Sequence, residues 1–297
     1  MDPSFTVRPY ASEVDLPRLV SLVQDAWSPE RQPFANFHIG DLFWRLRDPE
    51  CETRLFLWER GETLAGFVEW DVTEATLEVQ IHPRFFGREL DSAMLRWAEE
   101  QAGDSLVTTC AADSNEPFLS LLASRGYTKQ QDGTNHHCRP ISDVPVEIPV
   151  LPEGYSVRSL HDASEIAARV KGHQSGWQST KLTEERYRRL VGMPEYRTDF
   201  DLVVVAPDGD FVATANVWLD TNGAGLFEPL STAPAHRRIG LGRALLRFGM
   251  EQLRLARARS VWVASVLHNP AATALYESVG LSVVRRDACY RKSAQID

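Results

Sequence analysis

Six consecutive residues in the second half of the chain have the composition of an anion-binding turn, Arg237-Arg238-Ile239-Gly240-Leu241-Gly242. The two glycines allow a tight turn and a close approach of the backbone to a ligand, because they carry no Cβ. A helix is expected next, and the first N–H groups of a helix have no internal acceptor and lie at its positive end. Such a turn suits a pyrophosphate, to which the arginines would add charge-assisted hydrogen bonds. We call residues 237–243 the glycine turn.

The elements expected around the glycine turn are consistent with this chemistry. A strand is expected over 226–233, Pro234 bends the chain, and a helix is expected over 240–256. The same local pattern is also typical of a tight connection between a strand and a helix that carries surface arginines and binds no ligand, so this alternative stays open. The turn is not a Walker loop, because no Gly-Lys-Ser/Thr follows. It is not the dinucleotide-binding GxGxxG either, because Leu245 stands where the third glycine would be.

A second motif follows 27 residues after the last glycine of the turn, Asn269-Pro270-Ala271-Ala272-Thr273-Ala274-Leu275-Tyr276, and ends at Gly280-Leu281. Arg237-x-x-Gly240-x-Gly242 resembles the coenzyme A motif Q/R-x-x-G-x-G/A of the GNAT superfamily of N-acetyltransferases. The second motif is similar to the N-x-x-A-x-x-L-Y-x-x-x-G-F segment of the same family, with Leu281 in place of phenylalanine.

The resemblance implies a fold and an acyl donor. The fold would be α/β with a mixed sheet, as two tandem GNAT-like domains, each a mostly antiparallel twisted sheet with splayed central parallel strands flanked by helices. Acyl-CoA would lie where the strands at 226–232 and 261–266 part. Acetyl-CoA would be the donor and coenzyme A the product.

The resemblance also implies which residues hold the coenzyme. Backbone groups of the first splayed strand would pair with the pantetheine arm, as an added strand does. The amides of the glycine turn would bind the pyrophosphate. The expected coenzyme-binding residues are Leu230, Ser231, Thr232, Arg237, Arg238, Ile239, Gly240, Leu241, Gly242, Arg243 and Asn269.

Two residues are expected to be catalytic, Tyr276 and Glu228. In the family the amine attacks the thioester directly, and a tyrosine at the position of Tyr276 supplies a proton to the thiolate; packing of the helix against the sheet is the alternative. Glu228 is the candidate base on the strand that would face the acceptor. Pro229 indicates a local bulge, so an outward-facing strand residue is nearly as good an interpretation. His173 and Trp177 belong to the stretch that lines the acceptor side in the family, and surface-loop positions are the favoured interpretation.

The two halves of the chain repeat one order of expected elements, which indicates a tandem duplication. Each begins with a short strand, FTVRPY or YSVRSL, followed by a helix, a strand pair and a strand–turn–helix unit. Asn115 and Asn269 lie 154 residues apart, as do Gly126 and Gly280. Two landmarks at one offset make coincidence a poor explanation.

The proline-rich segment 141–152 separates the two halves and predicts an extended linker. The predicted domains are therefore 1–140, a degenerate GNAT-like copy without catalysis, and 153–297, the catalytic copy. We call them the first half and the second half.

The first half departs from the coenzyme motif. Aligned on Pro83 without a gap, it places Glu89 and Asp91 at the two glycine positions of the turn. Carboxylates there would repel a pyrophosphate, and their Cβ atoms would block its approach. At the fixed offset Leu122 stands at the tyrosine position and cannot donate a proton. A shift of one or two residues would instead bring Gly87 into the turn.

The composition of the chain excludes several classes of function. The 297 residues are 43% apolar with a net charge of −9, which argues against general nucleic-acid binding. The four cysteines are scattered, and adjacent His136-His137-Cys138 side chains converge poorly on one ion, so no metal is expected. No secretory signal and no stretch of roughly 18 apolar residues is present, so a cytoplasmic protein without membrane contact is expected. The oligomeric state stays open.

The leading hypothesis is an N-acetyltransferase that moves acetyl from acetyl-CoA to a primary amine of a small molecule. A protein or peptide amine is the alternative acceptor. A non-catalytic acyl-CoA sensor is the alternative function, although a sensor has no need of Tyr276 and Glu228. A protein-interaction scaffold is a third, against which the intact glycine turn speaks.

Overall fold

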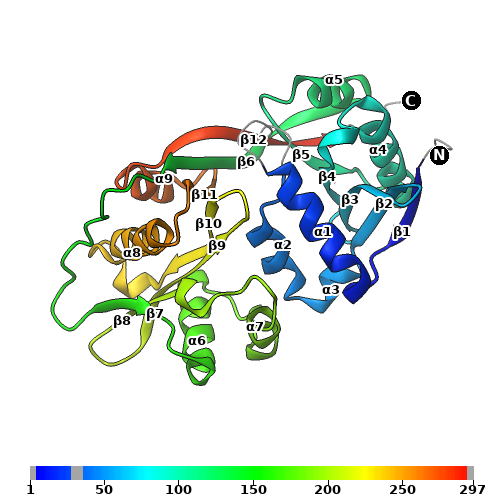
Figure 1. Cartoon of the computed structure of the whole chain (residues 1–297). Coiled ribbons are helices and arrows are strands. Elements are labelled where there is room, and N and C mark those ends of the chain that lie inside the picture. Colours follow the sequence, from blue (N-terminus) through cyan, green and yellow to red (C-terminus); the bar gives the residue numbers. More distant parts are fainter. Residues whose placement is uncertain (1–4, 28–35, 293–297) are drawn as a thin grey trace.

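The structure is a computed structural model that describes residues 5–27 and 36–292. Figure 1 shows two lobes, one from each half of the chain, joined across the molecule by long strands. The elements of the first half are β1 (Thr6–Pro9), α1 (Ser12–Ala26), α2 (Ile39–Leu46), α3 (Pro49–Glu52), β2 (Leu55–Arg60), β3 (Thr63–Asp71), β4 (Thr76–Ile81), α4 (Arg88–Ala102), β5 (Thr108–Ala112), α5 (Glu116–Ser124) and β6 (Tyr127–Pro140). Those of the second half are β7 (Ser156–Ser159), α6 (Ile166–Trp177), α7 (Glu184–Val191), β8 (Asp201–Val205), β9 (Phe211–Leu219), β10 (Ala224–Thr232), α8 (Leu241–Leu255), β11 (Ser260–Val266), α9 (Pro270–Glu277) and β12 (Ser282–Lys292).

All twelve of these strands form one sheet, in the order β1-β2-β3-β4-β5-β12-β6-β11-β10-β9-β8-β7. Each half keeps its first five strands together, but the sixth strands are exchanged. The last strand of the first half, β6, pairs with β11, and the last strand of the second half, β12, pairs with β5. The two exchanged strands also pair with each other in the middle of the sheet (Figure 1).

The predicted fold class is confirmed in its main features. The sheet is mixed, and each half contributes one parallel pair to an otherwise antiparallel arrangement, β4 with β5 and β10 with β11. The single continuous sheet with exchanged strands was not expected from the sequence. The domain boundaries 1–140 and 153–297 stay a prediction.

Helices cover both faces of the sheet in the second half. Leu202 and Val204 pack in the hydrophobic cluster beneath α8, whereas Val203 between them packs with Ala168 of α6. Successive residues of a strand point to opposite faces, so α8 and α6 lie on opposite sides of β8.

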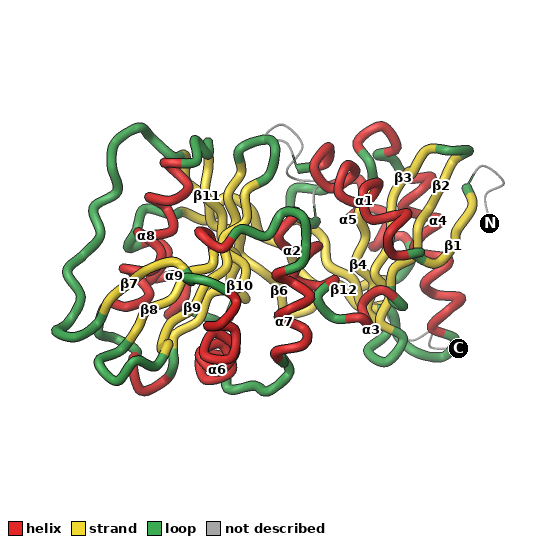
Figure 2. The backbone as a smooth tube through the Cα atoms, turned by 60° about the horizontal axis from the view of Figure 1, so that its bottom comes forward, coloured by secondary structure: helices red, strands yellow, loops and turns green. Residues whose placement is uncertain are grey.

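The two halves share a hydrophobic core. Helices α1 and α2 of the first half pack with α6 and α7 of the second half in one cluster. Phe43 stacks on Trp218 of β9 with ring centroids 5.8 Å apart. At Gly40 an added Cβ would lie 2.5 Å from the same indole, so only glycine permits this approach. Figure 2 shows α2 between the lobes, and its residues contact β9 and β10 of the second half.

The segment 141–152 contains no helix or strand and runs along α8 (Figure 1). The Ile141 amide donates to the Arg259 carbonyl at 2.9 Å, and the Val146 amide donates to the Glu251 carboxylate at 2.9 Å. The side chains of Ile141, Val146 and Leu151 pack against the core of the second half. The predicted linker is thus extended but held to the surface.

The exchange places two free cysteines, Cys110 of β5 and Cys289 of β12, directly opposite each other. Directly opposed residues of antiparallel strands have Cα separations of about 4.5–5.5 Å, within the range that a disulfide spans. We therefore expect diamide to form a Cys110–Cys289 disulfide, seen by peptide mass mapping without reductant, that disappears in Cys289→Ser. If each half kept its own last strand, Cys289 would not meet Cys110 and no such peptide would form.

Candidate active site

Strands β10 and β11 run parallel and then part. They pair from Ala224 to Phe227 on β10, and beyond Phe227 the described residues give β10 only β9 as a partner. The register shifts between Phe227 and Leu230, at the cis peptide Glu228–Pro229, and the Glu228 carbonyl accepts a hydrogen bond from the Trp218 indole at 2.7 Å. The bulge turns one edge of β10 away from β11. An extended ligand can pair with such an edge as an added strand does.

The residues of this open edge are held mainly through their side chains. Leu230 packs against the core beneath α8. Ser231 faces the other side, where its hydroxyl lies 3.2 Å from the Thr214 hydroxyl and against Gly176 of α6. The Thr232 carbonyl accepts from Arg237. The side chains of Leu230 and Ser231 are engaged elsewhere, so a ligand on the β11 side of the strand would meet their backbone N–H and C=O groups.

The glycine turn leads from β10 into α8 and has unpaired amides. Arg238 and Gly240 adopt left-handed conformations, with φ of 70° and 92°, and Gly240 is the N-cap of α8. Among the described residues, no acceptor pairs with the N–H groups of residues 238–243, whereas the Ala244 N–H donates to the Gly240 carbonyl. Six successive free N–H groups at the start of a helix form an anion site.

The side chains of the glycine turn have different roles. Arg237 donates to the carbonyls of Thr232 at 2.9 Å and Gly176 at 3.1 Å, so it fixes the turn to β10 and α6. Arg243 donates to the Ser278 hydroxyl at 3.2 Å. The side chains of Arg238 and Ile239 are exposed and Leu241 is buried in the core. An added Cβ at Gly242 would lie 3.1 Å from Leu275 of α9.

Asn269 is the N-cap of α9. Its side chain accepts a hydrogen bond from the Ala272 amide at 3.1 Å. Asn115 caps α5 in the same way, through the Phe118 amide at 3.3 Å. The asparagine shared by the two halves thus starts a helix in each, and a coenzyme contact of Asn269 stays a prediction.

Tyr276 lies on α9 with 5% of its surface exposed. Its ring packs edge-on against His137 of β6, at 5.1 Å between centroids, so the exchanged strand contributes to its environment. Burial, with a smaller effect from the charge of Glu228, raises the pKa of the phenol. The hydroxyl therefore stays protonated at neutral pH, as a proton donor must.

Glu228 sits at the bulge of β10, half-buried. Burial and the negative charge of Asp41 raise the pKa of Glu228 to about 8, against the opposing effect of Arg45 and Arg47. All three charged neighbours belong to α2 of the first half or its C-cap. The charge of Glu228 thus acts on the Tyr276 hydroxyl, and α2 of the first half contacts β10, the strand that carries Glu228.

The predicted surface-loop position of His173 is wrong. It is not a surface-loop residue but is 7% exposed within α6, with its ring 5.4 Å from that of Trp44 on α2. Burial, together with the charges of Arg169 and Arg47, lowers the pKa of His173 to about 3, so the ring is neutral. Trp177, at the end of α6, is 52% exposed.

Sequence reasoning missed α2 altogether. Its apolar residues recur at the spacing of a helix face, and a polar cap precedes them: His38 accepts from the Gly40 amide at 3.1 Å and Asp41 from the His38 amide at 2.8 Å. That spacing and cap are a recognisable helix signal. The charged residues that α2 carries toward Glu228 have no such signal, because their neighbourhood forms only when the halves pack.

The first half has a different turn from the one that a gapless alignment predicts. Helix α4 begins five residues after Pro83, whereas α8 begins seven residues after its counterpart Pro234. Gly87 therefore occupies the N-cap position of α4, and Glu89 takes the second helical position, which is glycine in α8. A carboxylate still stands in the first turn. Loss of coenzyme binding in this half stays a prediction.

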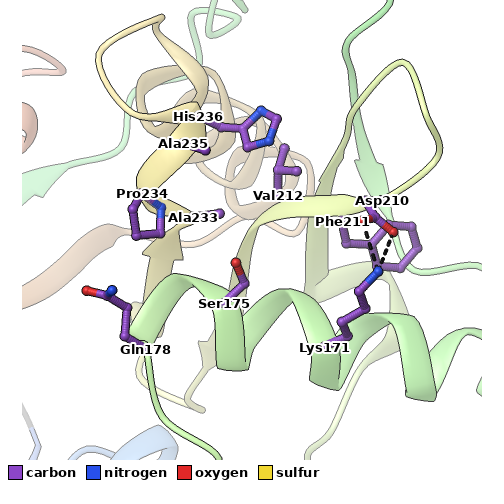
Figure 3. A pocket seen from close by; sticks show the side chains of 10 residues that line it. All are labelled: Lys171, Ser175, Gln178, Asp210, Phe211, Val212, Ala233, Pro234, Ala235 and His236. Atoms are coloured by element: carbon purple, nitrogen blue, oxygen red, sulfur yellow. Dashed lines mark hydrogen bonds and ion pairs between the residues drawn. The ribbon is translucent and has the colours of Figure 1, made fainter.

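A surface cavity of about 480 Å³ lies beside the approach to the glycine turn. Figure 3 shows its lining from α6 and from the segment after β10, with the Lys171–Asp210 ion pair at one side, 2.8 Å between the charged atoms. His236 in its lining accepts or donates a hydrogen bond at 2.9 Å with Tyr155. None of the predicted site residues lines this cavity. The site is therefore defined by the open strand edge and the glycine turn.

Two further findings concern the described residues alone. They contain no group of three or more His, Cys, Asp or Glu side chains that could hold a metal ion. Within 5–27 and 36–292, no helix has both the length and the apolar character to cross a membrane.

The chain was compared with known proteins. A sequence profile of the Acetyltransferase (GNAT) family matches residues 167–281. The chain is similar to mycothiol acetyltransferases of Nocardiopsis dassonvillei, at 29% identity over 72% of this chain and 73% of that protein, and of Thermobispora bispora, at 27% identity over 80% and 83%.

Two solved structures share the whole fold. A tandem GNAT protein from the clavulanic acid biosynthesis pathway covers 99% of each chain with a TM-score of 0.67 and 16% identity. A GCN5-related N-acetyltransferase from Sphaerobacter thermophilus covers 98% of this chain and 96% of its own, with a TM-score of 0.64 and 20% identity. At these identities the likeness concerns the fold.

Proposed function

We propose a specific reaction for this chain, whose second half belongs to the GNAT family of acetyltransferases and whose fold is that of a tandem GNAT protein. The reaction is transfer of acetyl from acetyl-CoA to a primary amine of a small molecule, by direct attack in a ternary complex. One observation carries the proposal. The open edge of β10 runs from Glu228 to the six free amides that start α8, so one extended ligand can reach both.

The residues fit a coenzyme A thioester along this path. The free N–H groups of residues 238–243 would receive the pyrophosphate, and the edge of β10 would pair with the pantetheine amides. The thioester end would then lie near the bulge, between Glu228 and Tyr276. Asn269 and the remaining predicted coenzyme-binding residues keep that role here as part of the proposal.

The chemistry removes two protons from the acceptor ammonium and supplies one to the sulfur of the leaving group. Glu228 would take a proton from the acceptor ammonium, directly or through water, so that the nitrogen lone pair can attack the thioester carbon. The N–C bond forms and the C–S bond breaks as the tetrahedral intermediate collapses, and the electron pair leaves on sulfur. Tyr276, whose hydroxyl stays protonated, would donate its proton to that thiolate. The attacking nitrogen, which still carries one proton too many for a neutral amide, would give that proton up, directly or through water, and so restore the Tyr276 hydroxyl.

The first half would form one wall of the acceptor site. Asp41, Arg45 and Arg47 all act on the charge of Glu228, so α2 stands beside the proposed base. A helix that contacts the strand of the proposed base leaves more room for a small acceptor than for an extended polypeptide. The name of the mycothiol acetyltransferase relatives supports the same choice.

The test is acetyl-CoA stabilisation of the protein, read as a shift in Tm, combined with free-thiol release against a panel of small amines and peptide amines. We expect a rise in Tm with acetyl-CoA and thiol release with a small amine. No rise in Tm at saturating acetyl-CoA would exclude every coenzyme-based function. A rise without turnover of any amine would favour the sensor, and turnover of peptides alone would favour the polypeptide acceptor.

Tyr276→Phe should lower kcat by about 100-fold or more, because it removes the proton donor and little packing volume. Affinity for acetyl-CoA should change by less than about twofold. Tyr290→Phe, on the exchanged strand β12, is the matched control and should keep full turnover. An equal fall in coenzyme affinity and kcat would assign Tyr276 to packing.

A further inference from the structure

Arg47, the C-cap residue of α2, is a positive group that the described residues leave without an ion pair. Its guanidinium lies over the Trp44 ring, 3.7 Å from the centroid. Its Nε atom is buried and finds no hydrogen-bond partner within residues 5–27 and 36–292. Arg45, two residues earlier on the same helix, differs, because it pairs with Glu69 at 2.5 Å and Glu78 at 2.9 Å.

The charge of Arg47 is poorly compensated. Burial lowers its pKa to about 10, although Asp48 and Glu228 act in the opposite direction. The nearby Arg186 adds a like charge and itself pairs with Asp48 at 3.2 Å. Glu228 does little to neutralise Arg47 at pH 7, because its own pKa is raised to about 8 and its carboxyl group is mostly protonated. Arg47 is half-buried, and folded proteins normally pair a partly desolvated guanidinium with a carboxylate.

The surroundings of Arg47 have the character of a ligand site. Trp44 supplies an aromatic face that also contacts His173, whose ring is held neutral by burial. Glu228, the proposed base, is close enough for its charge to act on Arg47. A planar guanidinium beside an aromatic face and a neutral imidazole matches a carboxylate, which it can bind through two parallel hydrogen bonds.

We propose that Arg47 binds a carboxylate group carried by the acceptor amine, so that the acceptors of this enzyme are amino acids or amines of similar charge. The proposal rests on the proposed function and specifies its substrate class. The acceptor would place its amino group at Glu228 and its carboxylate at Arg47, the guanidinium to which the described residues give no ion pair. The first half thereby determines specificity, while the second half holds the donor.

The experiment compares amines in matched pairs, such as 4-aminobutyrate and its primary amide, or serine and serinamide. We expect Arg47→Gln to lower kcat/KM for the carboxylate member by about 10- to 100-fold, the range for a hydrogen-bonded charge, mainly through KM. The amide member should change by no more than about twofold. The loss of Arg47 can also shift the pKa of Glu228, but this shift affects both members of a pair. It therefore cancels in the ratio of their kcat/KM values. Arg96→Gln, an exposed arginine of α4, is the control for charge alone.

Two results would overturn the proposal: a wild-type enzyme that does not distinguish the members of any pair by charge, or an Arg47→Gln variant that loses both members equally. Arg47→Lys keeps the positive charge but lacks the two parallel N–H donors of a guanidinium. Its kcat/KM for the carboxylate member should fall between those of the wild type and Arg47→Gln. A preference for amines that carry phosphate would also count against a carboxylate.

Binding separates this proposal from the acetyl-transfer proposal. With coenzyme A present, N-acetyl-4-aminobutyrate should raise Tm for the wild type and not for Arg47→Gln, and its amide should raise neither. If acetyl-CoA binds and no amine is acetylated, the transfer proposal fails while this Tm comparison still decides whether Arg47 binds a carboxylate. Absence of any difference between acid and amide would reject the site.

Discussion

Gly240→Asp is expected to abolish acetyl-CoA binding while the protein stays folded. Gly240 has a φ of 92°, and an added Cβ would meet nothing within 4 Å. Aspartate and asparagine tolerate this region better than other side chains, and both are favoured at a helix N-cap. Any side chain at this φ carries some backbone strain, so the aspartate variant is compared with one that carries the same strain. The aspartate also places a negative charge at the free amides of residues 238–243, where the pyrophosphate would bind.

Gly240→Asn is the matched control, because it has the same shape without the charge. Like charges brought together cost several kcal/mol, so we expect the aspartate variant to bind at least about 100-fold more weakly than the asparagine variant. The dissociation constant from calorimetry and Tm without ligand measure the two effects separately. The difference should shrink at high salt, which screens exposed charges. Equal affinities for the two variants would show that the phosphates bind elsewhere.

The features that local sequence specifies were predictable. The glycine turn, the helix that follows it and the Asn269 cap depend on residues within a few positions of one another. Their counterparts in the first half recur at one offset, and Asn115 does cap a helix as Asn269 does. The loop length before α4 was not predictable from the offset, because a two-residue difference in a turn leaves the later landmarks of a repeat nearly unchanged.

The exchange of β6 and β12 could not be predicted, for a physical reason. Alternation along a strand indicates which residues share a face but not which strand lies alongside. The fifth strands of the two halves, β5 and β11, occupy equivalent positions in the repeat, so either could pair with either of the last strands. The partner is chosen by the packing of whole halves, including the approach of Gly40 to Trp218.

The orientation of the Glu228 side chain could not be predicted from the sequence for a related reason. Pro229 indicated an irregular strand, but a bulge can turn a side chain to either face. The charges that define the site around Glu228 come from α2, almost two hundred residues earlier in the chain. Only the folded arrangement shows that a carboxyl group at this position has a raised pKa.

Glu228→Gln should lower kcat by about 10²- to 10⁴-fold, the range for loss of a general base. The pKa of Glu228 is raised to about 8, so below that pH the carboxyl group is protonated and cannot accept a proton. We therefore expect the kcat/KM of the wild type to rise with pH up to and through about 8. The residual activity of the glutamine variant should lack this rise. Steady-state rates between pH 6 and 9.5 measure both.

Stability supplies an independent check on the same group. A folded-state pKa raised above the unfolded value means that the protonated carboxyl is favoured in the folded protein. The resulting stability is present below the unfolded value of 4.5 and is lost as the pH rises through about 8. Tm of the wild type should thus fall relative to Glu228→Gln across this interval. A constant difference in Tm would mean that the pKa is not raised.

Asp41→Asn tests the cause of the raised pKa. Asp41 accepts a hydrogen bond from the His38 amide, which asparagine can also do, so α2 should keep its cap. Without the negative charge of Asp41, ionisation of Glu228 becomes easier, while Arg45 and Arg47 still favour it and Tyr276 stays neutral. The rise of kcat/KM should then move to lower pH. A profile that stays in place would mean that the group titrating near pH 8 is not Glu228, and the first half would lose its part in setting the base.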